Sequence, residues 1–218
     1  MRIVRYRLKL RLENPLPEDL AYPLYAALLQ QGDQGFAASA HLEAVTPVGQ
    51  FLYGNIWSAS LLGEESIAAL GPVLDAAKSF YLRRIQAPVE IAEKQVEQIE
   101  SVEELLAQPA LQRFTLALRT PVAFKSNGVY QLLPTQRLVL QSLISKWNGC
   151  FADDCPIEDE GSGLETLAAG LVYRGAELHT RDFSLKRAFI PGATGALDVE
   201  NRLQGFHRLL AAALLRFG

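Results

Sequence analysis

The fold is decided by residues 120–149, which read TPVAFKSNGVYQLLPTQRLVLQSLISKWNG. A strand pattern ends at Thr120-Pro121, a polar linker follows, and a helix begins at Pro134, after which apolar residues recur at helical spacing. The apolar side of that helix consists of Leu138, Leu140, Leu143, Ile144 and Trp147. The stretch therefore predicts half of a split β-α-β unit, with a polar connection long enough to contact a large ligand.

A second copy of this plan begins the chain. Residues 3–12 alternate between apolar and basic side chains, and a period of two is typical of a half-buried strand. We expect a helix to begin at Pro17. Proline is favoured in a first helical turn, since the N–H that it lacks would be unpaired there anyway. Residues 112–119 alternate in the same way before the helix at Pro134. Two such units predict a duplicated domain.

The fold class predicted from this duplication is α+β, with two tandem ferredoxin-like βαββαβ domains. We expect the first domain at residues 1–108 and the second at 109–218, with the last strand of the second missing. The expected helices are 17–30, 36–44, 64–84, 102–107, 134–147 and 201–217. The expected strands are 3–12, a hairpin within 50–62 that turns at Gly54-Asn55, 88–99, 112–119, 166–183 and 185–199, and an acidic loop is expected at 149–163.

Composition narrows the classes of protein that the chain can belong to. With 218 residues, 49% of them hydrophobic, the chain can build one large or two small cores. Its N-terminus is too charged for a signal peptide, and its longest apolar run, residues 209–215, is too short to span a bilayer, which predicts a cytoplasmic protein. The two cysteines and three histidines form no zinc pattern, so we predict no metal, no cofactor and reduced thiols.

The charge distribution is more informative than the net charge of −3. Residues 1–12 carry five basic and no acidic side chains, residues 166–218 carry seven basic and four acidic ones, and the middle of the chain is strongly acidic. A bipolar protein can bind phosphates on one side. The alternative is that the alternating basic residues are simply the solvated face of a strand.

Four further pieces of sequence resemble one known family. They are the turn Thr120–Phe124, the Leu133-Pro134 helix start, the Lys146–Asn148 helix end, and Phe189–Gly195, which is similar to a phenylalanine-containing glycine turn before the family's last helix. His41 also lies where many members carry a histidine after the first helix. In this order, on a doubled ferredoxin-like pattern, the pieces resemble the sixth family of CRISPR-associated proteins, the repeat-processing endoribonucleases of the RAMP superfamily.

The resemblance implies metal-independent cleavage of CRISPR repeat RNA by attack of a 2′-hydroxyl on the adjacent phosphate. His41 is the candidate acid or base, because the pKa of histidine lies near neutrality; the alternative is a surface or capping histidine. Tyr25 and Tyr53 are candidates to orient the phosphate or ribose, although aromatic residues of this kind are more often core or rim residues.

Repeat RNA is the partner that the resemblance implies, and cations should bind it. The candidate RNA-binding residues are Arg5, Arg7, Lys9, Arg11, Arg113, Arg119, Lys125, Arg137, His179, Arg181, Lys186 and Arg187. Their contacts with phosphate should weaken as the salt concentration rises.

The chain departs from the family pattern in two places. The sequence ends at Gly218, before the family's glycine-rich loop, so the resemblance implies a chain cut short at its C-terminal end, and no lysine lies between His41 and Phe51. The alternative function is therefore a non-catalytic repeat-RNA-binding subunit or fusion-derived domain among other CRISPR-associated proteins. A third interpretation is a protein-binding adaptor that uses the acidic middle of the chain.

Overall fold

The protein forms two compact units, residues Met1–Val102 (unit 1) and Glu103–Gly218 (unit 2), in a computed structural model. The structure describes residues 1–12, 14, 16–17, 20–40, 46–126, 128–158, 161–185 and 188–218.

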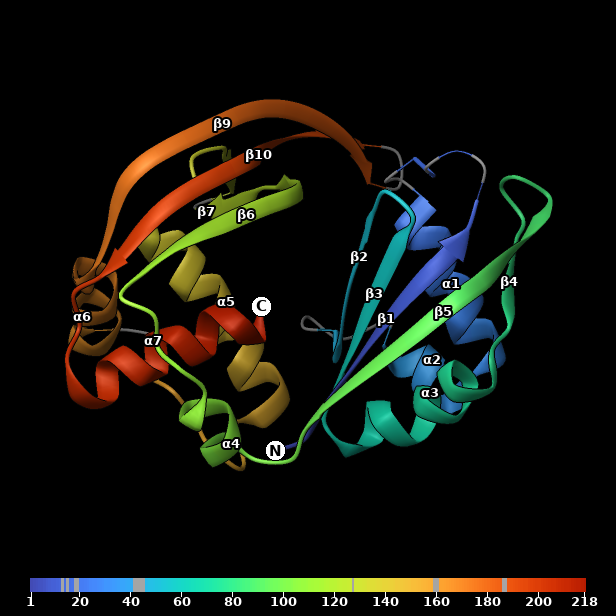
Figure 1. Ribbon diagram of the computed structural model, residues 1–218, viewed down its shortest axis with the longest axis horizontal. Coiled ribbons are helices and arrows are strands. Elements are labelled where there is room, and N and C mark those ends of the chain that lie inside the picture. The colour runs from blue at the N-terminus through green and yellow to red at the C-terminus, as the bar shows by residue number, and fades with distance from the viewer. Residues whose placement is uncertain are drawn as a thin grey trace. The chain divides into compact units, whose positions relative to one another are not determined.

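Unit 1 contains one antiparallel sheet and a layer of helices (Figure 1). Its elements are β1 (Ile3–Arg11), α1 (Ala21–Gln31), α2 (Gln34–Ser39), β2 (Val48–Tyr53), β3 (Ile56–Leu62), α3 (Glu64–Ala76), β4 (Ser79–Leu82) and β5 (Ala87–Ile99). The strand order is β2-β3-β1-β5-β4, with β1 paired antiparallel to both β3 and β5. If β4 is set aside as an added edge strand, this is the ferredoxin-like order.

The core of unit 1 lies between the sheet and its helices. The alternating side chains of β1 place Tyr6, Leu8 and Leu10 in this core and leave the basic residues on the other face. Trp57 and Phe80 are fully buried against each other, edge to face, with ring centroids 5.3 Å apart. The hairpin expected at Gly54-Asn55 is confirmed by the β2–β3 pairing.

Two helices of unit 1 differ from the expected bounds. Helix α1 begins at Ala21 rather than Pro17, and the helix expected over 64–84 ends at Ala76. The end of α3 is fixed by Lys94 on β5, whose ammonium donates to the carbonyl of Leu74 and, at 2.7 Å, to that of Asp75. Residues 79–82 then pair with β5 instead of continuing the helix, a pairing distant in sequence that helical periodicity does not reveal.

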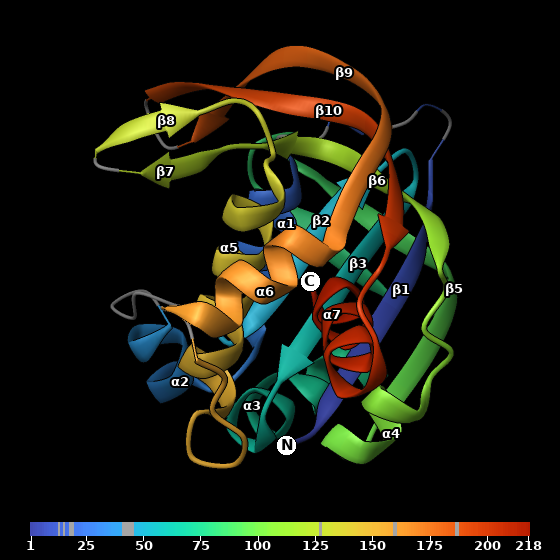
Figure 2. The ribbon, with the colours of Figure 1, turned by 90° about the vertical axis from the view of Figure 1, so that its left-hand side faces the viewer.

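Unit 2 repeats the plan with three long strands and a separate small hairpin (Figure 2). Its elements are α4 (Val102–Ala107), β6 (Arg113–Val122), β7 (Phe124–Ser126), β8 (Val129–Gln131), α5 (Gln136–Phe151), α6 (Ser162–Gly170), β9 (Leu171–Leu185), β10 (Ala188–Asn201) and α7 (Gly205–Phe217). The order β6-β10-β9 corresponds to the first three strands of the ferredoxin-like plan. The predicted α+β class is confirmed, and so is the ferredoxin-like organisation.

Local expectations for unit 2 need three corrections. The polar linker after Pro121 contains the β7–β8 hairpin, and the supposed acidic loop is interrupted by α6, which begins at Ser162 where a loop and then a strand were expected. The glycine turn expected at Phe189–Gly195 lies within β10. Gly195 forms a bulge there with φ of 129°, and a Cβ atom would lie 2.0 Å from the carbonyl oxygen of Glu177, so only glycine fits.

The helical side of unit 2 has an aromatic centre. Trp147 contacts Phe151 and Phe217 edge to face at 5.3 and 5.1 Å between ring centroids. The Trp147 indole also donates to the carbonyl of Cys155 at 2.7 Å, and the Asn148 amide both donates to and accepts from the backbone of Ile157. Residues 146–148, where the helix was expected to end, lie inside α5, which continues to Phe151, and the side chains of Trp147 and Asn148 fix the chain segment that follows the helix.

Candidate nucleic-acid interface

The basic row of β1 lies on the face of the sheet opposite the helices of unit 1. Arg7, Lys9 and Arg11 are exposed, while the side chain of Arg5 is only 17% exposed. The alternation of the strand places these residues together on one face, as a half-buried strand requires. The structure thus brings together the four cations that the sequence predicted for this strand.

Acidic side chains of β5 accompany this row. Arg5 pairs with Glu97 at 3.2 Å, Lys9 with Glu93 at 2.7 Å, and Arg11 with Glu90 at 3.4 Å. Exposed pairs of this kind contribute about 0–1 kcal/mol each to stability, so a phosphate can compete for these cations. The sequence did not reveal the pairing because these glutamates read as a separate acidic segment, and only the antiparallel register places them beside β1.

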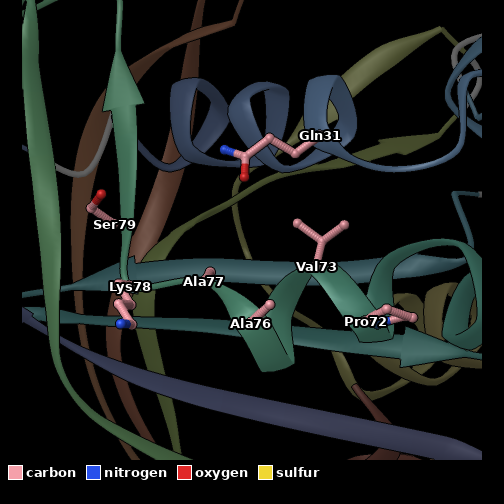
Figure 3. Close-up of a pocket in the computed structure, with 7 residues that line it drawn as sticks. All are labelled: Gln31, Pro72, Val73, Ala76, Ala77, Lys78 and Ser79. Atoms are coloured by element: carbon pink, nitrogen blue, oxygen red, sulfur yellow. The ribbon is translucent and has the colours of Figure 1, made fainter.

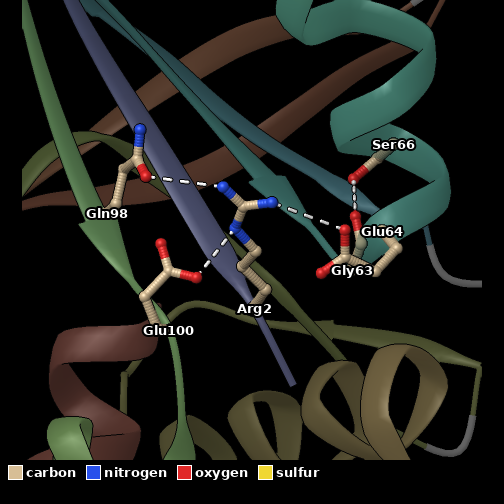
Figure 4. Close-up of polar contacts among 6 residues, drawn as sticks. All are labelled: Arg2, Gly63, Glu64, Ser66, Gln98 and Glu100. Carbon is tan, nitrogen blue, oxygen red and sulfur yellow. Dashed lines mark hydrogen bonds and ion pairs between the residues drawn. The ribbon is translucent and has the colours of Figure 1, made fainter.

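Arg2 directly precedes β1 and lies outside the alternation that forms the basic row (Figure 4). Its guanidinium lies 3.0 Å from Glu100 and 3.6 Å from Glu64, and it donates to Gln98 at 3.4 Å. Glu64 is the first residue of α3, and Glu100 follows β5. Arg2 therefore links three segments of unit 1, which is a structural role.

The three predicted catalytic residues differ in their surroundings. His41 lies outside the described residues. Tyr25 lies on α1, is 9% exposed and belongs to the apolar core, whereas Tyr53 ends β2 and is 48% exposed. Of the two tyrosines, Tyr53 is the one whose ring can contact a large ligand directly. The catalytic assignments remain predictions.

The predicted RNA-binding residues of unit 2 are spread over several elements. Arg113 and Arg119 are exposed on β6, and His179 and Arg181 are exposed on β9. The His179 imidazole lies 3.7 Å from the Glu177 carboxylate. Lys186 and Arg187 lie outside the described residues.

The two remaining predicted cations are Lys125, on β7, and Arg137, the second residue of α5. The Lys125 ammonium is placed 5.9 Å from the centre of the Tyr130 ring, across the β7–β8 hairpin, at the distance of a cation–π contact. Arg137 forms an ion pair with Glu165 on α6. Thr135 caps α5 by accepting from the backbone of Leu138 at 3.3 Å, which fixes where this helix begins.

Each unit contains buried titratable side chains whose pKa is shifted. Burial, reinforced by the Asp75 carboxylate to which its hydroxyl donates at 3.0 Å, raises the pKa of Tyr6 to about 12. Burial likewise raises the pKa of Tyr173 to about 12, and its hydroxyl donates to the Pro134 carbonyl at 2.8 Å. Burial lowers the pKa of Lys146. In each case burial disfavours the charged form.

None of the predicted site residues that the structure describes lines a shallow pocket in unit 1. It is formed by the ends of α1 and α3 and the start of β4 (Figure 3), and its lining consists of Gln31, Pro72, Val73, Ala76, Ala77, Lys78 and Ser79. Within the described part of the chain, no group of three or more histidine, cysteine, aspartate or glutamate side chains is placed to hold a metal ion. No described helix is both long and apolar enough to cross a membrane.

These features define the class of protein: a tandem ferredoxin-like protein with cations on the open faces of its sheets. Residues 116–218 match the family described as CRISPR-associated endoribonuclease Cas6. A protein of that name from Mycobacterium tuberculosis is 28% identical over 98% of this chain and 72% of its own length, and one from Streptococcus thermophilus is 27% identical over 95% and 87%. The chain is thus similar to the Cas6 endoribonucleases over nearly its whole length, as the sequence resemblance implied.

Solved structures support the fold independently. A Cas6 product complex aligns with 100% of this chain and 91% of its own, with a TM-score of 0.75 and 23% identity. Thermus thermophilus Cas6 aligns with 98% of this chain and 88% of its own, with a TM-score of 0.65 and 20% identity. At these identities the structural likeness establishes the fold alone.

Proposed function

We propose that this protein is an endoribonuclease that cleaves CRISPR precursor RNA within its repeats and so produces mature guide RNA. The observation that carries this proposal is the similarity, over nearly the whole chain, to proteins named CRISPR-associated endoribonuclease Cas6. The family match over residues 116–218 supports it further. Neither finding favours the alternative of a non-catalytic RNA-binding subunit.

In the proposed reaction the nucleophile belongs to the substrate. A base on the protein removes the proton of the 2′-hydroxyl, the 2′-oxygen attacks the adjacent phosphorus, and the bond from phosphorus to the 5′-oxygen breaks. An acid then protonates the leaving 5′-oxygen, which leaves a cyclic phosphate on one product and a 5′-hydroxyl on the other. The protein needs to move protons and offset charge on the phosphorane, and a metal ion is not required for either task.

His41 is the proposed acid or base, because an imidazole can accept or donate a proton near neutral pH. Tyr53 is exposed and can contact the ribose or phosphate, while Tyr25 is buried and would act by supporting its neighbours. The cations of β1, β6 and β9 are proposed to bind the RNA backbone. We also propose that the repeat RNA is the main partner, and that contacts with other CRISPR-associated proteins follow cleavage.

The test is incubation of the purified protein with its cognate repeat RNA in EDTA. We expect a single cut and a product with a cyclic phosphate end, and no cut in an RNA whose 2′-hydroxyl at the cleavage position is replaced by hydrogen. Tight binding of repeat RNA without cleavage would instead favour the non-catalytic alternative. Cleavage that stops in EDTA and returns with Mg²⁺ would exclude the metal-independent route.

The role of His41 is tested by His41→Ala. Removal of a general acid or base typically slows the chemical step about a hundred- to ten-thousand-fold. We expect this loss in the single-turnover rate, with RNA affinity unchanged within about twofold. Tyr81→Phe is the matched control, since Tyr81 is an exposed aromatic residue of β4 outside the proposed site. A His41→Ala rate equal to that of the wild type would remove His41 from the mechanism.

A further inference from the structure

A group of arginines on unit 2 is organised around one buried carboxylate. Glu200, near the end of β10, is 8% exposed, and one of its oxygens lies 3.1 Å from Nε of Arg174 and 3.2 Å from Nη2 of Arg202. Arg113 on β6 is the direct cross-strand neighbour of Glu200. We call these four residues the Glu200 cluster.

The members of the cluster lie on one face of the sheet. Arg113, Glu200 and Val172 are paired across the three strands, so their side chains point to the same side. Arg174 lies at a shift in the β9–β10 register and Arg202 directly follows β10, and both guanidiniums reach this face because they pair with the Glu200 carboxylate. On the same face, Asp198 accepts from the Thr115 hydroxyl at 2.9 Å. Three positive charges therefore outnumber the two carboxylates, Glu200 and Asp198.

The backbone beneath the cluster is held firmly. Asn201 is 1% exposed, its backbone N–H donates to the Gln112 carbonyl at 2.8 Å, and its side-chain oxygen accepts from the backbone of Leu203 at 3.1 Å. These bonds fix the strand end that carries Glu200 and Arg202. The positions of the two guanidiniums therefore depend on a rigid strand end and on the Glu200 carboxylate.

Only one nitrogen of each guanidinium contacts Glu200. The side chains of Arg174 and Arg202 are 53% and 52% exposed; Nη2 of Arg202 donates to the carboxylate, and Nε of Arg174 forms an ion pair with it. A guanidinium has five N–H donors in a planar fork that matches a phosphate, and one nitrogen of each arginine contacts Glu200, so both half-exposed side chains keep donors that a phosphate can accept from. A carboxylate that holds two such forks in place reduces the entropy lost when an anion binds.

We propose that the Glu200 cluster is a phosphate-binding site that contacts the RNA backbone, a role that rests on the proposed function in RNA processing. Arg174 and Arg202 bind the phosphate, Arg113 adds charge beside them, and Glu200 is a positioning residue that does not touch the RNA. The site fixes the position of the strand without reading its sequence, because phosphate contacts carry no base information.

The decisive experiment measures the affinity for RNA, with repeat RNA and an unrelated RNA of equal length as probes. We expect Arg174→Gln and Arg202→Gln each to weaken binding of both RNAs about tenfold at low salt. The slope of log affinity against log salt should become shallower by about 0.7 for each phosphate of a single strand that the variant no longer neutralises. Arg83→Gln is the matched control, because Arg83 is an exposed arginine in a turn of unit 1.

Glu200→Gln separates an organised site from simple charge attraction. The variant removes one negative charge, so attraction alone would strengthen RNA binding, whereas loss of the positioning carboxylate should weaken it about threefold to tenfold. The thermal unfolding midpoint of each variant shows whether it is folded. Stronger binding by a folded Glu200→Gln variant would overturn the positioning role.

The outcomes distinguish this inference from the proposed function. Cleavage of repeat RNA by the wild type, together with unchanged affinity in both arginine variants, would overturn the phosphate site alone and favour an acidic protein as the ligand of the cluster. Weakened binding of the unrelated RNA by the variants, without any cleavage of repeat RNA, would support the site and overturn the proposed function. A wild type that binds neither RNA would overturn both.

Discussion

The two units place their charges on sheet surfaces in opposite ways. On β1 of unit 1, Arg5, Lys9 and Arg11 each have a separate glutamate on β5, and most of these side chains are well exposed. In unit 2, two arginines share one buried carboxylate, Glu200. The number of basic residues in a strand therefore does not give the positive charge of the folded surface. Acidic residues on neighbouring strands, distant in the sequence, decide how many of these cations are already paired.

The largest expected effect on stability concerns Lys94, on the helix-facing side of β5. Its ammonium binds backbone carbonyls of α3 instead of forming an exposed ion pair. Lys94→Met removes an ammonium that donates to the carbonyls at the end of α3 but keeps the length of the side chain. Because hydrogen bonds to a charged group contribute about 1.5–3 kcal/mol, we expect the free energy of unfolding to fall by about 2 kcal/mol. Urea denaturation followed by circular dichroism measures it.

The control for this prediction is Lys78→Met. Lys78 lies at the pocket beside the same helix end and carries the same charge. A loss of stability in Lys94→Met no larger than in Lys78→Met would show that the anchor is not needed.

A smaller effect concerns Tyr6, which crosses from β1 to α3 beneath the charged face. Its pKa of about 12 lies above the ordinary value of 10, so its contribution to stability is complete below pH 10 and is lost as the pH rises toward 12. Tyr6→Phe removes a hydrogen bond from a neutral hydroxyl to the Asp75 carboxylate and should cost about 1.5 kcal/mol at pH 8, the lower end of the range for hydrogen bonds to charged groups. The difference in unfolding free energy between wild type and variant should shrink by pH 11.

Unfolding curves at pH 8 and pH 11 test this pH dependence. Tyr22→Phe serves as the reference, since Tyr22 is about half exposed on α1. A difference between wild type and Tyr6→Phe that stays constant or grows toward pH 11 would contradict the assigned direction.

The smallest effect on stability concerns the exposed pairs themselves. Glu93→Gln removes the partner of Lys9 and should change the free energy of unfolding by less than about 1 kcal/mol. The same change leaves the β1 row more positive, so we expect RNA affinity at low salt to rise about twofold to fourfold, with a steeper salt dependence. Fluorescence anisotropy with labelled repeat RNA measures it, with Glu104→Gln on α4 as the control.

An unchanged affinity in Glu93→Gln would indicate that RNA does not reach the open face of unit 1. In that case the contrast between the units would sharpen, because only the Glu200 cluster would remain as a cationic site organised by the fold.

Patterns that are local in the sequence predicted most of the fold. The alternation in residues 3–12, the turn at Gly54-Asn55 and the helix at 102–107 all correspond to elements of the structure. The predictions failed where pairing with a strand distant in the sequence determines the local structure. Residues 79–82 pair with β5 as β4 instead of continuing the helix, and Gly195 belongs to a bulge in β10 rather than to a turn. Periodicity contains no information about such pairings.

The candidate site was predicted less completely than the fold. The basic residues of β1 could be placed on one face because a strand has a period of two. Their glutamate partners, and the convergence of Arg174 and Arg202 on Glu200, depend on the register between strands, which the sequence of one strand does not specify. Tyr25 was a candidate to orient the phosphate or ribose, yet helix α1 turns it toward the core.

The segment after α5 has a practical consequence for protein engineering. The side chains of Trp147 and Asn148 hydrogen-bond to the backbone of Cys155 and Ile157, so the number of residues between these points is fixed by geometry. Adding or deleting a residue there would break both attachments at once, despite the polar, loop-like composition of the segment. A fluorescent label or affinity tag is therefore better inserted in the exposed turn at residues 83–86 than in this acidic stretch.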